Sequence, residues 1–295
     1  MNRKSELLIV GLARNSAKNL AGEVQRIARL MTYFYKEIDF YVVESDSSDN
    51  TVEVLRNLTS SMPNFKFETL GNLEKSIPNR IERLRYCRNR YVIRYREMQN
   101  LFGRTYSEIL VVDLDIRNRA LKLKDLSRLF SLNLEWAALF ANQKGRYFDI
   151  YALRHDSWMP TDCFTEVTKL IEKGLSSRES KQLAIWSKMR KINRDGAPIP
   201  VNSAFGGMGL YKSWVFDKFD YSINETPLEA TESEHVALHH KIQNAGGSMY
   251  ILPWFTNFGW NPHNLASFRS LRFLDRVSKN RVLKPIRQAL RSRLG

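Results

Sequence analysis

The feature that most constrains the fold is a regular alternation of strand-like and helix-like segments over residues 6–116. Short apolar runs alternate with longer segments in which apolar residues recur every three or four positions. Such an order predicts an α/β domain with a mainly parallel sheet covered by helices. The predicted strands cover residues 6–11, 39–44, 64–70 and 108–116, and the predicted helices cover residues 16–38, 51–61 and 79–102.

The composition is that of a globular chain that favours anionic partners. Of 295 residues, 43% are hydrophobic and 26% are charged, which is enough to bury a full-sized core. The net charge of +15 favours nucleic acid, acidic lipid or a phosphorylated small molecule as a partner. Cys87 and Cys163 have no Cys or His partner at metal-ligand spacing, which indicates a reducing compartment. No apolar run is long enough for a signal or a membrane span, so we expect a cytoplasmic protein.

Polar side chains stand where the predicted strands end, and in a parallel sheet these ends meet at one edge. Arg14 and Asn15 follow the first strand, residues 44–49 follow the second, and Asp113 and Asp115 close the fourth. Two carboxylates spaced by one residue point to the same side of a strand. They can share Mg²⁺ or Mn²⁺, which leaves positions open for a substrate's phosphates. The alternative for this pair is a solvent-exposed strand end whose aspartates cap a helix or a turn.

The segment after the second strand also has two explanations. Glu44 stands at the strand end, where it can accept hydrogen bonds from a nucleotide base or a ribose. Asp49 or Asn50 is expected to cap the helix that begins near Thr51.

The predicted helix of residues 79–102 carries seven arginines. A charge run of this kind is usually a solvated face, and we expect that for most of them. Arg88 and Asn89 lie beside the apolar stripe of the helix, so we expect one of them to face inward. There a guanidinium can donate directional hydrogen bonds to diphosphate oxygens.

Several motifs stand in one order along the chain, namely "GLARN", "VESDSSDNT", "RIERLRYCRNRYV", "EILVVDLDI", "YFDIYALR", "AFGGMGLYK" and "ESEHVALHHKI". Together they resemble nucleotide-sugar glycosyltransferases of the GT-A fold, over roughly residues 6–263. More narrowly, they resemble the fungal capsule-associated α-1,3-mannosyltransferases and their bacterial relatives. The resemblance implies a GT-A domain over residues 1–266, with a nucleotide-binding half of about residues 1–118 and an acceptor-binding half of about residues 119–266.

The resemblance also implies roles for individual residues. A nucleoside-diphosphate sugar would lie across the strand ends and give its hexose, mannose in the narrower family, to a hydroxyl of a surface glycan or a lipid-linked oligosaccharide. Asp113 and Asp115 would hold Mn²⁺ or Mg²⁺, and His263 would be a further ligand or an ordinary loop residue. The residues near the nucleotide would be Ala13, Arg14, Glu44, Asp46, Asp49, Arg88 and Asp113.

The second half would supply the sugar and acceptor contacts. Gly206 and Gly207 would let the backbone approach a ligand, although a tight turn needs glycine equally. Glu232 or Glu234 would take the proton of the acceptor hydroxyl. Thr231 and Glu234 also form a capping box, which would occupy Glu234 with the backbone and leave Glu232 freer for chemistry. A retaining enzyme would need no such base, and the sequence leaves the stereochemistry open.

Three histidines follow these glutamates, and His235 is the one expected to contact the sugar or the acceptor. His235 and His239 are four residues apart, like the zinc ligands of the HExxH motif, but Val236 stands where that motif has glutamate. We therefore expect no zinc, one histidine packed near the site, and the others, including His240, exposed.

The C-terminal segment of residues 267–295 differs from the rest of the chain. Residues 269–293 contain nine basic residues and one acidic residue, interleaved with apolar positions. This pattern predicts a basic amphipathic helical segment, which can lie on an anionic membrane such as the inner face of the cell membrane. The alternative is a solvated C-terminal helix packed on the domain.

Two other functions compete with glycosyl transfer. A nucleic-acid-binding protein would explain the charge and the 12% aromatic content, but it predicts a basic stripe across the fold. Here the positive charge is concentrated in one helix and the C-terminal segment, so we expect no nucleic-acid partner. The other alternative is an inactive relative that serves as a scaffold, and the intact Asp113 and Asp115 argue against it.

Overall fold

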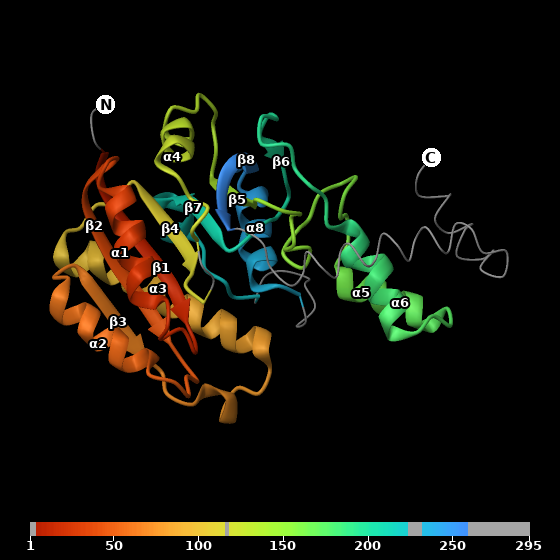
Figure 1. Cartoon of the computed structure of the whole chain (residues 1–295), viewed down its shortest axis with the longest axis horizontal. Coiled ribbons are helices and arrows are strands. Elements are labelled where there is room, and N and C mark those ends of the chain that lie inside the picture. Colours follow the sequence, from red (N-terminus) through yellow and green to blue (C-terminus); the bar gives the residue numbers. More distant parts are fainter. Residues whose placement is uncertain (1–3, 116–117, 224–231, 259–295) are drawn as a thin grey trace.

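The computed structural model describes residues 4–115, 118–223 and 232–258. The strands form one eight-stranded sheet in the order β3-β2-β1-β4-β7-β5-β8-β6 (Figure 1). The strands are β1 (Lys4–Ala13), β2 (Tyr35–Glu44), β3 (Phe65–Thr69), β4 (Glu108–Asp113), β5 (Ala138–Gln143), β6 (Ile199–Pro200), β7 (Met208–Lys212) and β8 (Met249–Phe258). The helices are α1 (Leu20–Met31), α2 (Thr51–Ser61), α3 (Arg80–Phe102), α4 (Leu123–Phe130), α5 (Cys163–Glu172), α6 (Ser177–Ala184), α7 (Ser213–Lys218) and α8 (Glu234–Asn244), with short 3-10 turns η1 (Leu73–Lys75) and η2 (Trp186–Lys188).

The sheet is mixed but mainly parallel. β1 pairs in parallel with β2 and β4, β2 with β3, and β5 with β8. β7 is antiparallel to β4 and β5, and the short β6 is antiparallel to β8. These pairings confirm the predicted fold class, an α/β fold with a mixed, mainly parallel sheet flanked by helices. Because β4 of the first half pairs with β7 of the second half, both halves share one sheet.

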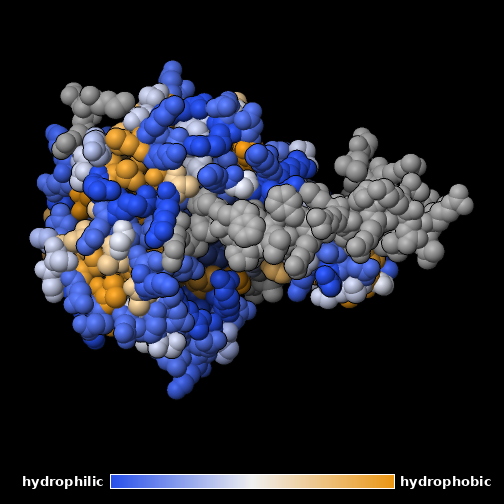
Figure 2. All heavy atoms as spheres, viewed as in Figure 1, coloured by the Kyte–Doolittle hydropathy of each residue, from blue (hydrophilic) through white to orange (hydrophobic). Residues whose placement is uncertain are grey.

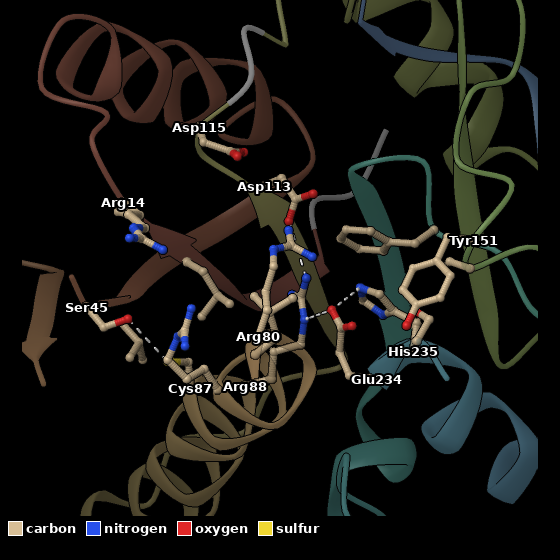
Figure 3. Close-up of a pocket in the computed structure, with 18 of the residues that line it drawn as sticks. Arg14, Ser45, Arg80, Cys87, Arg88, Asp113, Asp115, Tyr151, Glu234 and His235 are labelled. Atoms are coloured by element: carbon tan, nitrogen blue, oxygen red, sulfur yellow. Dashed lines mark hydrogen bonds and ion pairs between the residues drawn. The ribbon is translucent and has the colours of Figure 1, made fainter. Parts of the chain in front are cut away.

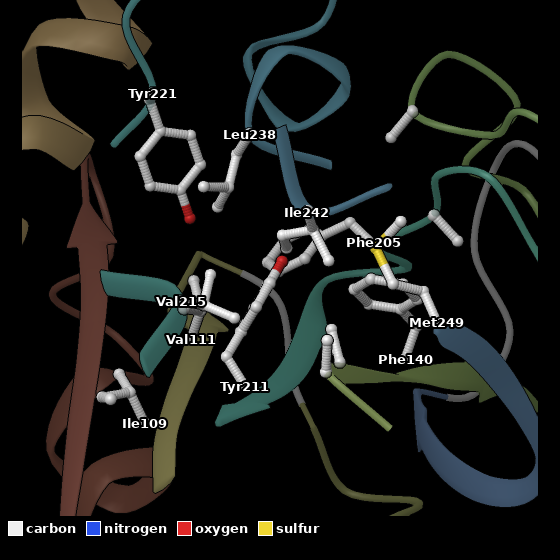
Figure 4. Packing of buried hydrophobic residues seen from close by; sticks show 14 of the residues in the cluster. Ile109, Val111, Phe140, Phe205, Tyr211, Val215, Tyr221, Leu238, Ile242 and Met249 are labelled. Carbon is white, nitrogen blue, oxygen red and sulfur yellow. The ribbon is translucent and has the colours of Figure 1, made fainter. Parts of the chain in front are cut away.

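Successive side chains of the strands point into two hydrophobic cores, one on each face of the sheet. Leu8 and Val10 of β1 join the core that contains side chains of α3, α7 and α8, whereas Leu7 and Ile9 join the core that contains side chains of α1, α2 and α4. Figure 4 shows part of the first core, where side chains of β4, β5 and β7 lie close to those of α8. Since helices cover both faces and the visible surface is mostly hydrophilic (Figure 2), the strand ends are the natural place for a ligand.

β1 continues past Gly11, where the sequence predicted its end. A Cβ atom at Gly11 would lie 2.6 Å from the carbonyl oxygen of Val112 and 2.9 Å from the side chain of Leu114. The glycine therefore serves close packing against β4 and its extension, not a turn. As a result, β1 reaches Ala13 and Arg14 directly follows it.

The predicted helix of residues 16–38 is shorter in the structure. α1 ends at Met31, and β2 already begins at Tyr35, which pairs with Lys4 of β1. Sheet pairing thus overrides the helical periodicity at residues 35–38. The predicted helices of residues 51–61 and 79–102 agree with α2 and α3 to within one residue.

The arginines of α3 are not a solvated face, which corrects the expectation from the sequence. Of the seven, Arg80 alone is exposed. Arg83, Arg85 and Arg88 are buried, with at most 6% of each residue exposed. Arg85, for example, donates to the carbonyl oxygen of Glu232 at 2.9 Å. The arginine run therefore connects α3 to segments that lie far away in the sequence.

Two predictions concern parts of the chain outside the described residues. These are the metal role of His263 and the basic helical segment of residues 267–295, and both stay predictions. Within the described ranges, no helix is both long enough and apolar enough to cross a membrane.

Candidate functional site

A cavity of about 250 Å³ lies at the carboxyl ends of the parallel strands. Its walls come from the ends of β1, β2 and β4, the first turns of α3 and the start of α8 (Figure 3). Both basic and acidic side chains line the cavity, and this combination suits a phosphorylated ligand that binds together with a cation. The charged lining residues are Arg14, Arg80, Arg83 and Arg88 on one hand, and Asp46, Asp113, Asp115, Asp149 and Glu234 on the other.

Asp113 and Asp115 both line this cavity. Asp113 is the last residue of β4, and its backbone N–H donates to the carbonyl oxygen of Gly207 at 2.9 Å. Leu114 packs into the opposite core and is 2% exposed, and Asp115 follows beyond the strand end. The strand is thus shorter than the predicted range of residues 108–116, but the two aspartates still border the same space.

This pair of aspartates fits a hard divalent cation. Burial raises the pKa of the Asp113 carboxyl above its usual range; Arg88 opposes this shift, and Asp115, Asp149 and Glu234 add to it. A cation beside these carboxylates would relieve their repulsion. Among the described residues, no group of three His, Cys, Asp or Glu side chains could hold a metal ion. A pair of carboxylates leaves coordination positions for the phosphates of a ligand, as Mg²⁺ and Mn²⁺ sites commonly do.

Arg88 joins the two acidic sides of the cavity (Figure 3). Its Nε donates to Oε1 of Glu234 at 2.9 Å, and its Nη2 donates to Oδ1 of Asp113 at 3.4 Å. The guanidinium also lies over the ring of Phe205, 5.2 Å from the centroid. Burial alone would lower the pKa of Arg88, but Tyr91, Glu234 and Asp113 hold it well above its usual value, so the side chain stays charged.

Three further arginines surround the start of α3. Arg80 and Arg83 lie in its first two turns, after the N-cap Asn79. Cations are unfavourable at the positive end of a helix dipole, so an anionic ligand would stabilise this arrangement. Arg80 is exposed and forms no ion pair with a described residue, whereas Arg14 pairs with Glu74 at 3.0 Å.

Of the three acidic residues predicted after β2, Asp46 alone lines the cavity. It has a φ of 58°, and its carboxylate accepts from the backbone N–H of Glu74 at 2.8 Å. Glu44 is 2% exposed and accepts from the N–H of Ser47 at 3.0 Å and the hydroxyl of Thr69 at 2.5 Å. Glu44 therefore holds the loop that carries Asp46 and does not line the cavity, so its predicted contact with a base or ribose stays a prediction.

Asp49 bonds to the first residue of α2 from the position before the N-cap Asn50, whose own side chain makes no capping bond. Its Oδ1 accepts from the N–H of Thr51 at 3.0 Å, and its Oδ2 accepts from the N–H of Ala17 at 3.1 Å. Hydrogen bonds from the hydroxyl and the N–H of Thr51 lower the pKa of Asp49. Asp49 thus ties α2 to the turn after β1 and does not line the cavity, whereas Ala13 does.

Gly206 and Gly207 form the turn before β7 and do not line the cavity. Their φ angles are 67° and 82°. A Cβ atom at Gly206 would lie 2.6 Å from both the carbonyl oxygen of Ala141 and Nε2 of Gln143. The glycines serve a tight, enclosed turn, which was the alternative explanation. Their neighbour Phe205 does line the cavity.

Asp149 is a cavity residue that the sequence reasoning did not identify. Its Oδ2 accepts from the N–H of Gly206 at 2.9 Å, and burial raises its pKa. The available signal was the acidic residue within the apolar "YFDIYALR" motif. Because that residue follows no predicted strand end, strand order gave no reason to choose it.

Glu232 and Glu234, the two candidate bases, are placed the other way round from the expectation, which left Glu232 freer for chemistry. α8 begins at Glu234 without a side-chain capping bond, and Thr231 lies outside the described residues. Glu234 lines the cavity and bonds to Arg88, not to the backbone. Glu232 does not line the cavity, and its carboxylate pairs with Arg154 at 3.0 Å. Glu234 is therefore the better placed of the two for chemistry.

His235 lines the cavity and is 2% exposed. His239, which the sequence suggested to be exposed, is fully buried. Ser203 and Tyr211 bond to its two ring nitrogens at 2.8 and 2.9 Å. Burial lowers the pKa of His239 to about 3, so its ring is neutral. His240 is partly exposed.

Comparison with known proteins finds similarity to solved structures only. No protein-family model matches the chain. No curated protein matches it either.

Three solved structures illustrate the likeness. The mannosyltransferase PcManGT from Pyrobaculum calidifontis, in complex with GDP-Man and Mn²⁺, is 11% identical with a TM-score of 0.46 over 85% of this chain and 56% of that chain. S. aureus TarS 1-349 is 12% identical with a TM-score of 0.45 over 91% and 64% of the two chains. Mannosyl-3-phosphoglycerate synthase from Rubrobacter xylanophilus is 13% identical with a TM-score of 0.42 over 93% and 76%. Likeness at this level assigns this chain neither a substrate nor a reaction, and the chain spans little more than half the length of the first of these proteins.

Proposed function

We propose that the chain is a metal-dependent glycosyltransferase of the GT-A type, which takes a hexose from a nucleoside-diphosphate sugar and gives it to a hydroxyl group. The observation that carries the proposal is the position of Asp113 and Asp115, two acidic residues at one strand end, in the same cavity as four arginines. Carboxylates bind a hard cation, and the cation and arginines together can neutralise a diphosphate. A nucleic acid would instead meet five acidic side chains in this cavity.

The donor would bind with its nucleoside beside β1 and β2 and its diphosphate near α3. Ala13, Arg14 and Asp46 line the first region, and Arg80 and Arg88 line the second. A cation held by the aspartate pair supplies positive charge to offset the charge that builds on the departing diphosphate. Glu44 and Asp49 contribute indirectly, because they hold the loops that carry the lining residues.

Glu234 would take the proton of the acceptor. The acceptor oxygen forms a bond to the anomeric carbon, and the bond from that carbon to the diphosphate breaks with its electron pair on the diphosphate. The acceptor proton moves to the carboxylate of Glu234, which corresponds to an inverting reaction. A product that retains the anomeric configuration would assign the proton to the leaving diphosphate.

The sequence of the C-terminal segment supports a proposal for the acceptor and the place of action. The nine basic residues of residues 269–293 would hold the protein at an anionic membrane, on the inner face of the cell membrane. A lipid-linked oligosaccharide or a growing surface glycan is the acceptor that such a position favours. Mannose, which the narrower resemblance implies, is the first sugar to test.

A thermal-shift panel of GDP-, UDP-, dTDP- and CMP-sugars, each with and without Mn²⁺ or Mg²⁺, tests the proposal. A donor at about 100 times its Kd should raise Tm by roughly 5 °C, and the rise should depend on the metal. Asp115→Ala should remove the metal-dependent part and lower turnover on the order of 10³-fold, whereas the exposed loop variant Asp195→Ala should change neither. A shift with oligonucleotides but with no sugar nucleotide would overturn the proposal.

A further inference from the structure

His235 has two buried ring nitrogens without a hydrogen-bond partner. It is the second residue of α8, and its ring stacks on Phe205 with 3.8 Å between centroids and 22° between planes. Neither Nδ1 nor Nε2 has a hydrogen-bond partner within the described structure. Oε1 of Glu234 is 3.7 Å from Nε2, which is too far for a hydrogen bond.

His239, one turn later on the same helix, shows what this fold does with a buried histidine that has a purely structural role. Its two ring nitrogens bond to Ser203 and Tyr211, as described above. Leaving buried polar atoms unpaired is costly, and native proteins mostly avoid it. His235 differs from His239 because it lines the cavity, so the partner of its nitrogens can come from a ligand.

The chemistry of the ring identifies the kind of ligand group. Burial, together with Arg88 and His239, lowers the pKa of His235 well below its usual value, so the ring is neutral. A neutral imidazole offers one donor and one acceptor. A hydroxyl group also donates and accepts, whereas a phosphate oxygen accepts only and is better served by the arginines of the cavity.

We propose that His235 determines which donor sugar the protein accepts, by exchanging a hydrogen bond with a ring hydroxyl of the hexose. The inference rests on the proposed function of the cavity. Figure 3 shows His235 beside Glu234, with Asp113 on the other side of Arg88. If Asp113 and Asp115 hold a cation and the donor's diphosphate, the sugar of the donor would lie near His235. The sugar-selecting contact would then come from α8 and not from the strand ends.

Two variants of His235 separate hydrogen bonding from packing. His235→Phe keeps a flat ring against Phe205 without polar atoms, and His235→Gln restores a donor and an acceptor. Kd values would be measured by calorimetry with Mn²⁺ for GDP, GDP-mannose and GDP-glucose, and for UDP, UDP-glucose and UDP-galactose. We expect His235→Phe to bind the free diphosphates within twofold of the wild type. Its affinity for the preferred sugar nucleotide and its selectivity between the epimers should each fall about tenfold, which corresponds to the loss of one good hydrogen bond. His235→Gln should recover part of both.

A matched control comes from the same helix. His239→Phe would leave the hydroxyls of Ser203 and Tyr211 without their partner, so it should lower Tm, whereas His235→Phe should not. Two outcomes would overturn this inference alone, provided that the wild-type protein binds these nucleotides. One is an unchanged epimer selectivity in His235→Phe, and the other is an equal loss of its affinity for the free diphosphate and for the sugar nucleotide. If the wild-type protein binds neither these six ligands nor any other sugar nucleotide of the thermal-shift panel, the proposed function fails, and this inference fails with it.

Discussion

The two walls of the cavity are built in different ways. The first wall consists of the ends of β1, β2 and β4 and the start of α3, and the second consists of Asp149, Phe205 and the start of α8. In the first wall, parallel strands bring distant residues to one edge by topology alone. At the second wall, Asp149 holds a turn, and Glu232 pairs with Arg154 and does not line the cavity. The two ring nitrogens of His235 have no hydrogen-bond partner among the described residues. In a wall built from loops and a helix start, the internal partners of a residue therefore decide which of its polar atoms stay available to a ligand.

The largest expected effect is a loss of activity on substitution of Glu234, compared with the same substitution of Glu232. Glu234→Gln keeps an acceptor for Arg88 but removes the basic carboxylate, so kcat should fall on the order of 10³-fold with little change in donor Kd. Glu232→Gln should keep kcat within about threefold. It should lower the free energy of unfolding by about 1–2 kcal/mol, because Asp162 is then the one charged partner that Arg154 keeps among the residues that the structure describes. Steady-state kinetics and urea unfolding measure the two effects.

The opposite pattern would reverse the roles of the two glutamates. If Glu232→Gln lost the activity and Glu234→Gln kept it, the pairing of Glu232 with Arg154 would not prevent Glu232 from acting as the base. The capping-box interpretation of the sequence would then have chosen the right residue.

A second test asks whether the glycine turn serves the fold or the ligand. Gly206→Ala places a Cβ atom 2.6 Å from a backbone oxygen at a φ of 67°, so it should cost about 2–3 kcal/mol of folding free energy. Gly22→Ala is the matched control, because nothing lies within 4 Å of the added Cβ atom in α1. It should stabilise the protein by about 1 kcal/mol through helix propensity. A Gly206→Ala protein with normal stability but lost donor binding would show instead that the backbone approaches the ligand.

The difference between the two walls also explains how much of the site could be predicted from the sequence. The alternation of segments predicted the sheet, and the ends of its parallel strands predicted that Arg14, Asp46 and the aspartate pair would meet. Strand order alone could not reveal that Glu44 holds its own loop, because that depends on the hydroxyl of Thr69 in the neighbouring strand. Sequence spacing sets which side chains are near an edge, but the hydrogen-bond partners come from tertiary contacts.

The second wall was predicted less well for a physical reason. Asp149 reaches the cavity from a loop after β5, and its position is fixed by the N–H of Gly206, a residue 57 positions later. The arginines of α3 show the same effect, since Arg85 and Arg88 bond to residues 232 and 234. The charge run looked solvated in the sequence because partners such as Glu234 and Asp46 lie far from it along the chain.

The smallest test uses the two cysteines, one at the cavity and one away from it. Burial raises the pKa of both thiols, to about 12 for Cys163, so little thiolate exists at pH 8 and alkylation by iodoacetamide should be slow but faster at higher pH. Cys87 lines the cavity beside Ser45, whereas Cys163 begins α5 outside it. A sugar nucleotide with Mn²⁺ at ten times its Kd should therefore slow the labelling of Cys87 about tenfold, by occupancy alone, and leave Cys163 unchanged. Peptide mass spectrometry would follow both residues in one sample, with Cys163 as the internal control. Equal protection of the two cysteines would mean that the ligand stabilises the whole fold. No protection of Cys87 would mean that the nucleotide binds away from the first wall.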